Sequence, residues 1–126
     1  MLKDNIHLGK TGEEEAAGLL KRNGYRIIHR NYRTRSGEID IIARDKDTIC
    51  FVEVKARRCD RFGLPEEAIS AAKKRQISKA ALKYLQENDL LDNNARFDVV
   101  SILYSQGRPE PELIKDAFEL DSSFTY

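Results

Sequence analysis

The order of periodic segments predicts an α/β sandwich in which helices flank a mixed central sheet. One helical pattern comes first, three strand patterns follow, and a second helical pattern precedes two further strands. A chain of 126 residues has the length of one domain with its own hydrophobic core. We therefore expect a single domain over residues 1–126, with its core at about 8–119 and a loose tail at 120–126.

Composition argues against several classes of protein. No apolar run approaches the length of a membrane span, and the residues after Met1 are polar where a signal peptide would be apolar. We therefore expect a cytoplasmic protein without membrane contact. The 2 cysteines and 2 histidines are too few for a disulfide framework or a structural zinc site, so Cys50 is expected in the core.

Charge is unevenly distributed along the chain. Residues 1–86 contain 19 basic and 12 acidic side chains, a net charge of +7, whereas residues 87–126 contain 3 and 9, a net charge of −6. The net charge of the whole chain, +1, does not reveal this difference between its two parts. A basic surface of this kind suits a polyanion such as nucleic acid.

The first helix is predicted at residues 8–23, where Thr11 and Glu14 have the spacing of a capping box. A start one turn earlier, with Gly12 inside the helix, fits the same pattern. Glu13 falls on the apolar stripe of this helix, which is an unusual place for a glutamate. The alternative is that Glu13 only complements the helix dipole. The stripe consists of Ala16, Ala17 and Leu20.

A cationic strand is predicted at residues 25–33. Residues 21–35 contain six Lys or Arg side chains and no acid. The arginines of this segment are candidates for contacts with phosphate groups, although a solvated strand face would have the same pattern. They are Arg26, Arg30, Arg33 and Arg35. His29 is expected to be a packed or surface residue and not a ligand.

Residues 36–58 predict a hairpin whose four-residue turn, at 45–48, places Arg44 opposite Ile49. Side chains two residues apart in a strand share a face. In the second strand that rule puts acidic, basic and apolar residues on one face. They are Ile49, Phe51, Glu53 and Lys55.

Acidic residues interrupt both strands of this hairpin, although strand interiors disfavour them. In the predicted register Asp40 lies opposite Glu53, with about 4.5–5.5 Å between their Cβ atoms. A slip of one residue would separate the two side chains. Two adjacent carboxylates repel unless a proton, a lysine or a divalent cation lies between them. Carboxylates together with substrate phosphate are typical ligands of Mg²⁺, and a solvent-facing Glu–Lys pair is the alternative.

These residues resemble a known motif. Gly37-Glu38-Ile39-Asp40, followed by Glu53-Val54-Lys55, is similar to the core of the PD-(D/E)xK nuclease superfamily, with Ile39 in the place of its proline. With the flanking Phe51 and Arg57, the sequence resembles more closely the YraN-type bacterial proteins, predicted endonucleases similar to archaeal Holliday-junction resolvases. The resemblance covers roughly residues 8–119 and implies a restriction-endonuclease-like three-layer sandwich.

The resemblance also implies the roles of individual residues. Asp40, Glu53 and the backbone carbonyl of Val54 would hold Mg²⁺ or Mn²⁺, and Glu13 would contribute directly or through water. Lys55 would position or polarise the nucleophile.

The same resemblance assigns supporting roles. Glu38 matches the motif and would support an arginine or a water near the site. Lys73 matches a lysine at the start of the second helix. The side chains expected to contact DNA are Arg33, Arg35, Arg57 and Lys73.

The second half of the chain predicts further elements. Residues 59–64 are expected to form a loop beside the site, and 65–69 one helical turn. Ser70 is expected to cap a helix that reaches about residue 88 and is basic on its outer side. Its apolar face is predicted to contain Ala72, Ile77, Ala80, Ala81, Tyr84 and Leu85.

The last segments predict two strands. A polar loop is expected at residues 86–95 and a strand at 96–103, in which Asp98 is interpreted as a structural acid paired with a neighbouring arginine. A turn is predicted at 107–111 and an edge strand at 113–118.

The function predicted from these observations is a Mg²⁺-dependent endonuclease acting on DNA, including branched or junction DNA. A homodimer is expected because a two-fold junction offers two equivalent cleavage sites. Two alternatives remain open. One is a nucleic-acid-binding module with the nuclease fold and little or no catalysis, and the other is a partner-binding protein that uses its acidic C-terminal third as the interface.

Overall fold

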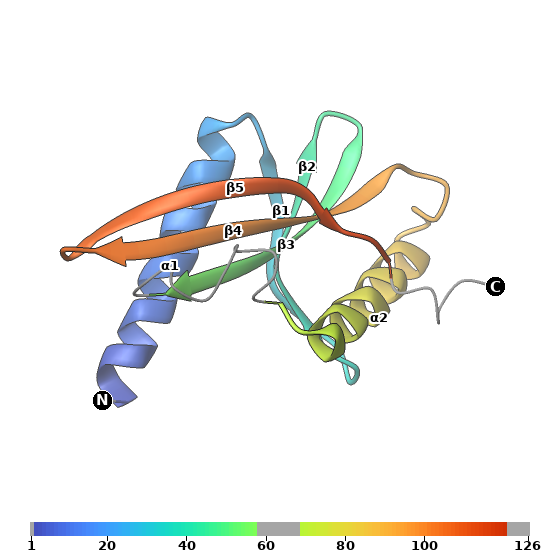
Figure 1. The fold of residues 1–126 in the computed structure, drawn as a ribbon. Helices are drawn as coiled ribbons and strands as arrows, with labels where there is room; N and C mark the ends of the chain where they lie inside the picture. Colours follow the sequence, from blue (N-terminus) through green and yellow to red (C-terminus); the bar gives the residue numbers. More distant parts are fainter. Residues whose placement is uncertain (1, 58–68, 121–126) are drawn as a thin grey trace.

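The computed structural model describes residues 2–57 and 69–120. The predicted order of one helix, three strands, one helix and two strands is confirmed (Figure 1). The elements are α1 (Leu2–Arg22), β1 (Arg26–Arg33), β2 (Glu38–Asp45), β3 (Thr48–Arg57), α2 (Ala71–Glu87), β4 (Ala95–Ser105) and β5 (Arg108–Phe118).

The five strands form one sheet in the order β1-β2-β3-β4-β5. β3 and β4 are parallel, and the other three neighbouring pairs are antiparallel, so the sheet is mixed as predicted. Parallel neighbours need a crossover connection, and α2 lies in the connection between β3 and β4. The protein is therefore an α/β protein.

The two helices pack on opposite faces of the sheet, which lies between them (Figure 1). Strand alternation produces the two faces, because odd and even positions of β3 and β4 belong to different core clusters. The α2 side includes Ile42, Phe51, Ile77, Ala81, Phe97 and Val99. The α1 side includes Leu20, Ile41, Cys50, Val52, Val100 and Ile102, so the predicted burial of Cys50 is confirmed.

The predicted start of the first helix is wrong. α1 begins at Leu2, so Thr11 and Glu14 lie within the helix and do not form a capping box at its start. The alternative prediction, a start one turn earlier, is closer to the observed first residue of the helix but still lies after it. The reason is that residues 3–10 are largely polar and provide no apolar period from which the first turns could be predicted.

The second helix agrees with its predicted caps. Ser70 is the N-cap, and its hydroxyl accepts a hydrogen bond from the Lys73 N–H at 3.1 Å. Asn88 is the C-cap. Ala72, predicted on the apolar face, is exposed because the first turn of α2 extends past the core. The remaining predicted residues of that face are buried.

The C-terminal hairpin is longer than predicted. β5 begins at Arg108, so residues 108–111 are strand and not turn. The turn consists of Gln106 and Gly107, which have positive φ angles of 53° and 76°. Two prolines fit in β5 because it is an edge strand, where a missing N–H need not break the ladder.

Asp98 is a fully buried acid in a satisfied hydrogen-bond network. Its carboxylate accepts hydrogen bonds from the Tyr25 hydroxyl at 2.7 Å, from Arg96 Nε at 3.0 Å and from the Asp116 N–H at 2.9 Å. Arg96 also donates to Asp45 at 2.7 Å. The network joins β4 to the start of β1, the β2–β3 hairpin and β5. The predicted structural role of Asp98 with a neighbouring arginine is confirmed.

The predicted loop at 59–64, most of the helical turn at 65–69 and the tail from 121 onward lie outside the described residues. Within the described parts of the chain, neither helix is long and apolar enough to cross a membrane.

Candidate functional site

The predicted register of the central hairpin is confirmed near the turn, but the predicted pair of Asp40 and Glu53 lies beyond the end of the ladder. Arg44 pairs with Ile49, and Ile42 pairs with Phe51. The turn itself is shorter than predicted, because Asp45 and Thr48 also pair and leave a two-residue loop. The first loop residue, Lys46, has a φ angle of 56°, which excludes the predicted type I turn, where this residue has φ near −60°.

β2 bends at Asp40 and directs its carboxylate toward β3. The β2–β3 ladder runs to the pair Ile41 and Val52, and beyond it Asp40 Oδ2 accepts a hydrogen bond from the Val54 N–H at 2.8 Å. Ile39 and Ile41, two residues apart, belong to opposite core clusters, so regular alternation breaks at Asp40. Such local irregularities in strands are a common way to re-aim a side chain.

Asp40 and Glu53 form a largely buried pair of neighbouring carboxyl groups. Burial raises the pKa of Asp40 above its usual value, although the Val54 N–H favours the anion. Burial and the neighbouring charge of Asp40 raise the pKa of Glu53 to about 8. In the protein without a bound cation, burial and the Asp40 charge therefore disfavour ionisation of Glu53.

Two lysines lie near this pair. Lys73 Nζ, which comes from the first turn of α2, is 4.0 Å from Glu53 Oε2. The side chain of Lys73 is 32% exposed and that of Glu53 is 11% exposed, so the contact is partly shielded from water. The charge of Lys55, an exposed residue of β3, also favours the Glu53 anion. The cations thus oppose the effect of burial on the carboxylates.

Glu13 contacts an asparagine of β1. In the β1–β2 ladder Arg30 pairs with Ile41 and Tyr32 with Ile39, so Asn31 lies opposite Asp40. Asn31 Nδ2 donates a hydrogen bond to Glu13 Oε1 at 3.0 Å. The structure therefore places Glu13 on the α1 side of the site.

Sequence reasoning did not identify Asn31. The available signal was an asparagine within a strand, a place where this residue is disfavoured. Its φ angle of 54° explains the choice, because Asn tolerates the left-handed region better than most residues.

A polar groove lies beside the acidic pair, between the β1–β2 turn and α2. Its volume is about 350 Å³. Among the predicted DNA-contacting residues, Arg33, Arg35 and Lys73 line it, together with Glu38. Arg33 Nε is 3.5 Å from Glu38 Oε2, so Glu38 pairs with an arginine. Arg57, at the end of β3, does not line this groove.

The acidic side chains described at this site form a pair, Asp40 and Glu53, and no larger group. Among the side chains that the structure describes, at residues 12–57 and 69–120, no three His, Cys, Asp or Glu come together as a metal-binding group. The Asp40–Glu53 pair provides oxygen donors only. Such a donor set suits Mg²⁺, which is commonly held by one or two carboxylates with water and phosphate. It does not suit a structural zinc ion, which needs four ligands.

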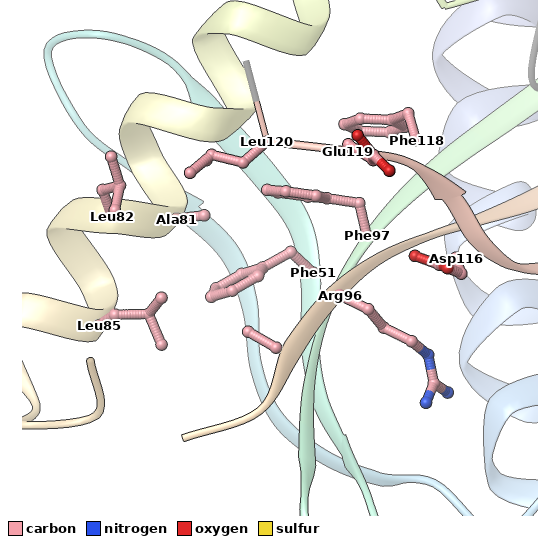
Figure 2. A pocket seen from close by; sticks show the side chains of 11 residues that line it. Phe51, Ala81, Leu82, Leu85, Arg96, Phe97, Asp116, Phe118, Glu119 and Leu120 are labelled. Carbon is pink, nitrogen blue, oxygen red and sulfur yellow. The ribbon is translucent and has the colours of Figure 1, made fainter. Parts of the chain in front are cut away.

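A second cavity, of about 260 Å³, lies between the C-terminal half of α2 and the strands β3 to β5 (Figure 2). Its inner wall is aromatic, formed by Phe51, Phe97 and Phe118. The guanidinium of Arg96 points away from the rings of Phe51 and Phe97 (Figure 2). This cavity contains none of the predicted site residues.

The fold and the site define an α/β protein with a mixed five-stranded sheet, in which β2 and β3 bring together a largely buried Asp–Glu pair close to a lysine of α2. Residues 12–102 match the family described as uncharacterised protein family UPF0102. The chain belongs to this family.

Individual relatives agree with this membership. A UPF0102 protein of Syntrophus aciditrophicus (strain SB) is 55% identical over 119 residues, which cover 94% of each chain. The UPF0102 protein GSU0650 of Geobacter sulfurreducens is 54% identical over 117 residues, covering 92% of this chain and 91% of the relative.

A solved structure titled "Crystal structure of SSO0001" has a TM-score of 0.44 and 20% identity. The match covers 91% of this chain and about half, 54%, of that structure's chain.

Proposed function

We propose that this protein is a Mg²⁺-dependent DNA endonuclease with a restriction-endonuclease-like fold, a member of the PD-(D/E)xK superfamily. The observation that carries the proposal is the buried pair of Asp40 and Glu53, brought together from adjacent strands beside Lys55 and Lys73. Burying two carboxyl groups against each other is unfavourable for folding. Unfavourable arrangements of this kind are most common at functional sites.

Asp40, Glu53 and the carbonyl of Val54 would hold the cation. In a strand the N–H and C=O of one residue point to the same side. Since the Val54 N–H points at Asp40, its carbonyl also faces β2. When bound, Mg²⁺ would neutralise phosphate oxygens and lower the pKa of a bound water.

Side chains of the protein would orient the attacking water, stabilise negative charge and bind the DNA backbone. Lys55, exposed beside Glu53, would orient the attacking water and stabilise the developing negative charge. Asn31 would hold Glu13 on the α1 side of the sheet by its hydrogen bond, from where Glu13 would act on the cation through water. Arg33, Arg35 and Lys73 in the groove, with Arg57 on β3, would contact the DNA backbone.

The direct test is cleavage of end-labelled DNA in the presence of Mg²⁺ or Mn²⁺, comparing linear duplex, single strand, flap and four-way junction. We expect cleavage that disappears in Asp40→Asn and Lys55→Ala and persists in Glu110→Gln, which removes one exposed acid of the edge strand β5. Preference for the four-way junction would assign the branched substrate. Metal-independent cleavage, or equal activity in all variants, would refute the proposal.

The second candidate function is DNA binding without hydrolysis. It is favoured by one observation, that no third acidic, His or Cys side chain joins Asp40 and Glu53 within the described segments. It predicts tight DNA binding in the wild type and in Asp40→Asn, with no cleavage of any of the four substrates.

The expected homodimer belongs to the same proposal, because paired sites would cut a two-fold junction symmetrically. Sedimentation analysis with and without four-way junction DNA tests it, and a monomer in both conditions would contradict it.

A further inference from the structure

We infer that the polar groove is a binding subsite for a phosphate group of the nucleic-acid backbone, and that Lys73 couples this subsite to the acidic pair. In the free protein Lys73 pairs with Glu53. When a phosphate occupies the groove, Lys73 turns to it and leaves the carboxylates to the divalent cation. This inference rests on the proposed function.

The groove is held in place by its own turn. Thr34 Oγ1 accepts hydrogen bonds from the N–H groups of Ser36 and Gly37, at 3.1 and 3.2 Å. The Thr34 hydroxyl and the Thr34 N–H both donate to the Gly37 carbonyl, at 3.0 and 2.8 Å. A turn fixed in this way presents Arg33 and Arg35 at defined positions, which reduces the ordering cost of binding an anion.

The same turn packs closely against α2. A Cβ atom at Gly37 would lie 2.8 Å from both Cβ and the carbonyl oxygen of Gln76. Only a glycine allows the turn to approach the helix so closely. The close approach brings the arginines of the turn and Lys73 of the helix to one groove.

Charge balance favours an anion in this groove. It is lined by three cationic side chains, Arg33, Arg35 and Lys73, and by one acid, Glu38. Glu38 pairs with Arg33, and both side chains are largely exposed, at 48% and 77%. Arginine is well suited to phosphate because its planar donors match the phosphate oxygens.

Lys73 lies between the groove and the acidic pair. It lines the groove, and its ammonium is 4.0 Å from the Glu53 carboxylate. The pair is loose enough to exchange, because 4.0 Å is longer than a charge-assisted hydrogen bond. A cation at Asp40 and Glu53 must compete with this ammonium, whereas a phosphate in the groove attracts it. Each ligand therefore promotes the binding of the other.

Calorimetric titration with Mn²⁺ tests the coupling, with and without a short phosphorothioate DNA duplex that resists hydrolysis. In the wild type the duplex should tighten Mn²⁺ binding. In Lys73→Ala, Mn²⁺ alone should bind about 1.5- to fivefold more tightly, the range expected on losing one partly exposed competing ion pair. The enhancement by the duplex should fall by the same factor.

Two control variants separate the effect of position from that of total charge. Lys73→Arg should retain the wild-type coupling. Arg75→Ala, an exposed cation on the same helix, should leave it unchanged. Coupling in Lys73→Ala equal to that of the wild type would overturn the inference, even if cleavage is metal-dependent. Absence of Mn²⁺ binding to the wild type would instead refute the proposed function, and this inference with it.

Binding of phosphate to the groove is tested separately, without metal, by titrating the ¹⁵N-labelled protein with inorganic phosphate. The backbone amide signals of Ser36, Gly37 and Lys73 should shift in the wild type and shift less in Lys73→Ala. Shifts confined to other parts of the chain would overturn the subsite.

Discussion

At the scale of single residues, Glu53 combines burial with a neighbouring carboxylate. Its pKa of about 8 in the folded protein is well above the value near 4.3 expected in an unfolded chain. Between these values the folded state binds more protons than the unfolded state. The contribution of Glu53 to the free energy of unfolding of the metal-free protein should therefore be greatest below pH ~4.5 and fall as the pH rises toward about 8.

We predict that Glu53→Gln removes most of this pH dependence. The variant keeps the shape of the side chain but cannot ionise, so at about pH 8 it should be more stable than the wild type by on the order of 2 kcal/mol. Urea unfolding in the presence of a chelator, across this pH range, measures the difference. Glu110→Gln, an exposed acid on β5, should retain the wild-type slope. An identical slope in Glu53→Gln would show that Glu53 is not the titrating group.

Asp98 is the residue on which the buried network of the α1 side depends. Asp98→Asn should destabilise the protein by about 3 kcal/mol, because it leaves the largely buried Arg96 without one of its ionic partners. Urea unfolding at neutral pH measures the cost. Asp92→Asn, an exposed change in the loop before β4, should cost less than about 0.5 kcal/mol. Equal stability of the two variants would mean that the network contributes little.

At the scale of elements, the contact between the β1–β2 turn and α2 depends on Gly37. Gly37→Ala would place a methyl group 2.8 Å from the backbone of Gln76, so the turn must move away from the helix. We predict a loss of roughly 1–3 kcal/mol in stability and weaker DNA binding, because the groove widens. Chemical unfolding and fluorescence anisotropy with labelled DNA measure the two effects.

Gly18→Ala is the matched control for this prediction. Gly18 lies within α1, and a Cβ there would meet only the flexible end of Arg22, at 3.2 Å. The substitution should stabilise the protein by roughly 0.5–1 kcal/mol, as expected in a helix interior. It should leave DNA binding unchanged. If both alanine variants behave alike, close packing at Gly37 is not the cause.

At the scale of the whole molecule, the uneven charge distribution predicts a salt-dependent interaction with DNA. Residues 1–86 have a net charge of +7, and two basic side chains of the turn line the groove. Binding measured over a range of salt concentrations should weaken as salt rises. Arg33→Ala and Arg35→Ala should each reduce the slope of log K against log salt by about 1.

Arg108→Ala provides the comparison, because Arg108 is exposed at the start of β5, within the acidic C-terminal third. It should leave the slope unchanged. Equal slopes for all three variants would argue against the groove as the DNA-contacting surface and favour the partner-binding alternative.

Much of this architecture could be predicted from local pattern. Alternation in β3 assigned Phe51 and Cys50 to opposite faces, and the side chain of Ser70 predicted the start of α2. The pairing of Arg44 with Ile49 was predicted from the position of the turn, and it is observed although the turn is two residues shorter. The start of α1 and the length of β5 were missed, since neither has an apolar period at its outer end.

The sequence by itself determined the order of the elements, the two faces of the central strands and the residue types of the candidate site, because these depend on periodicity and local chemistry. Only the tertiary structure decided how those residues meet. The bend at Asp40, the position of Glu13 beside Asn31 and the approach of Lys73 to Glu53 join segments far apart in the chain. Such contacts depend on how the sheet and helices pack, and local pattern does not encode that packing.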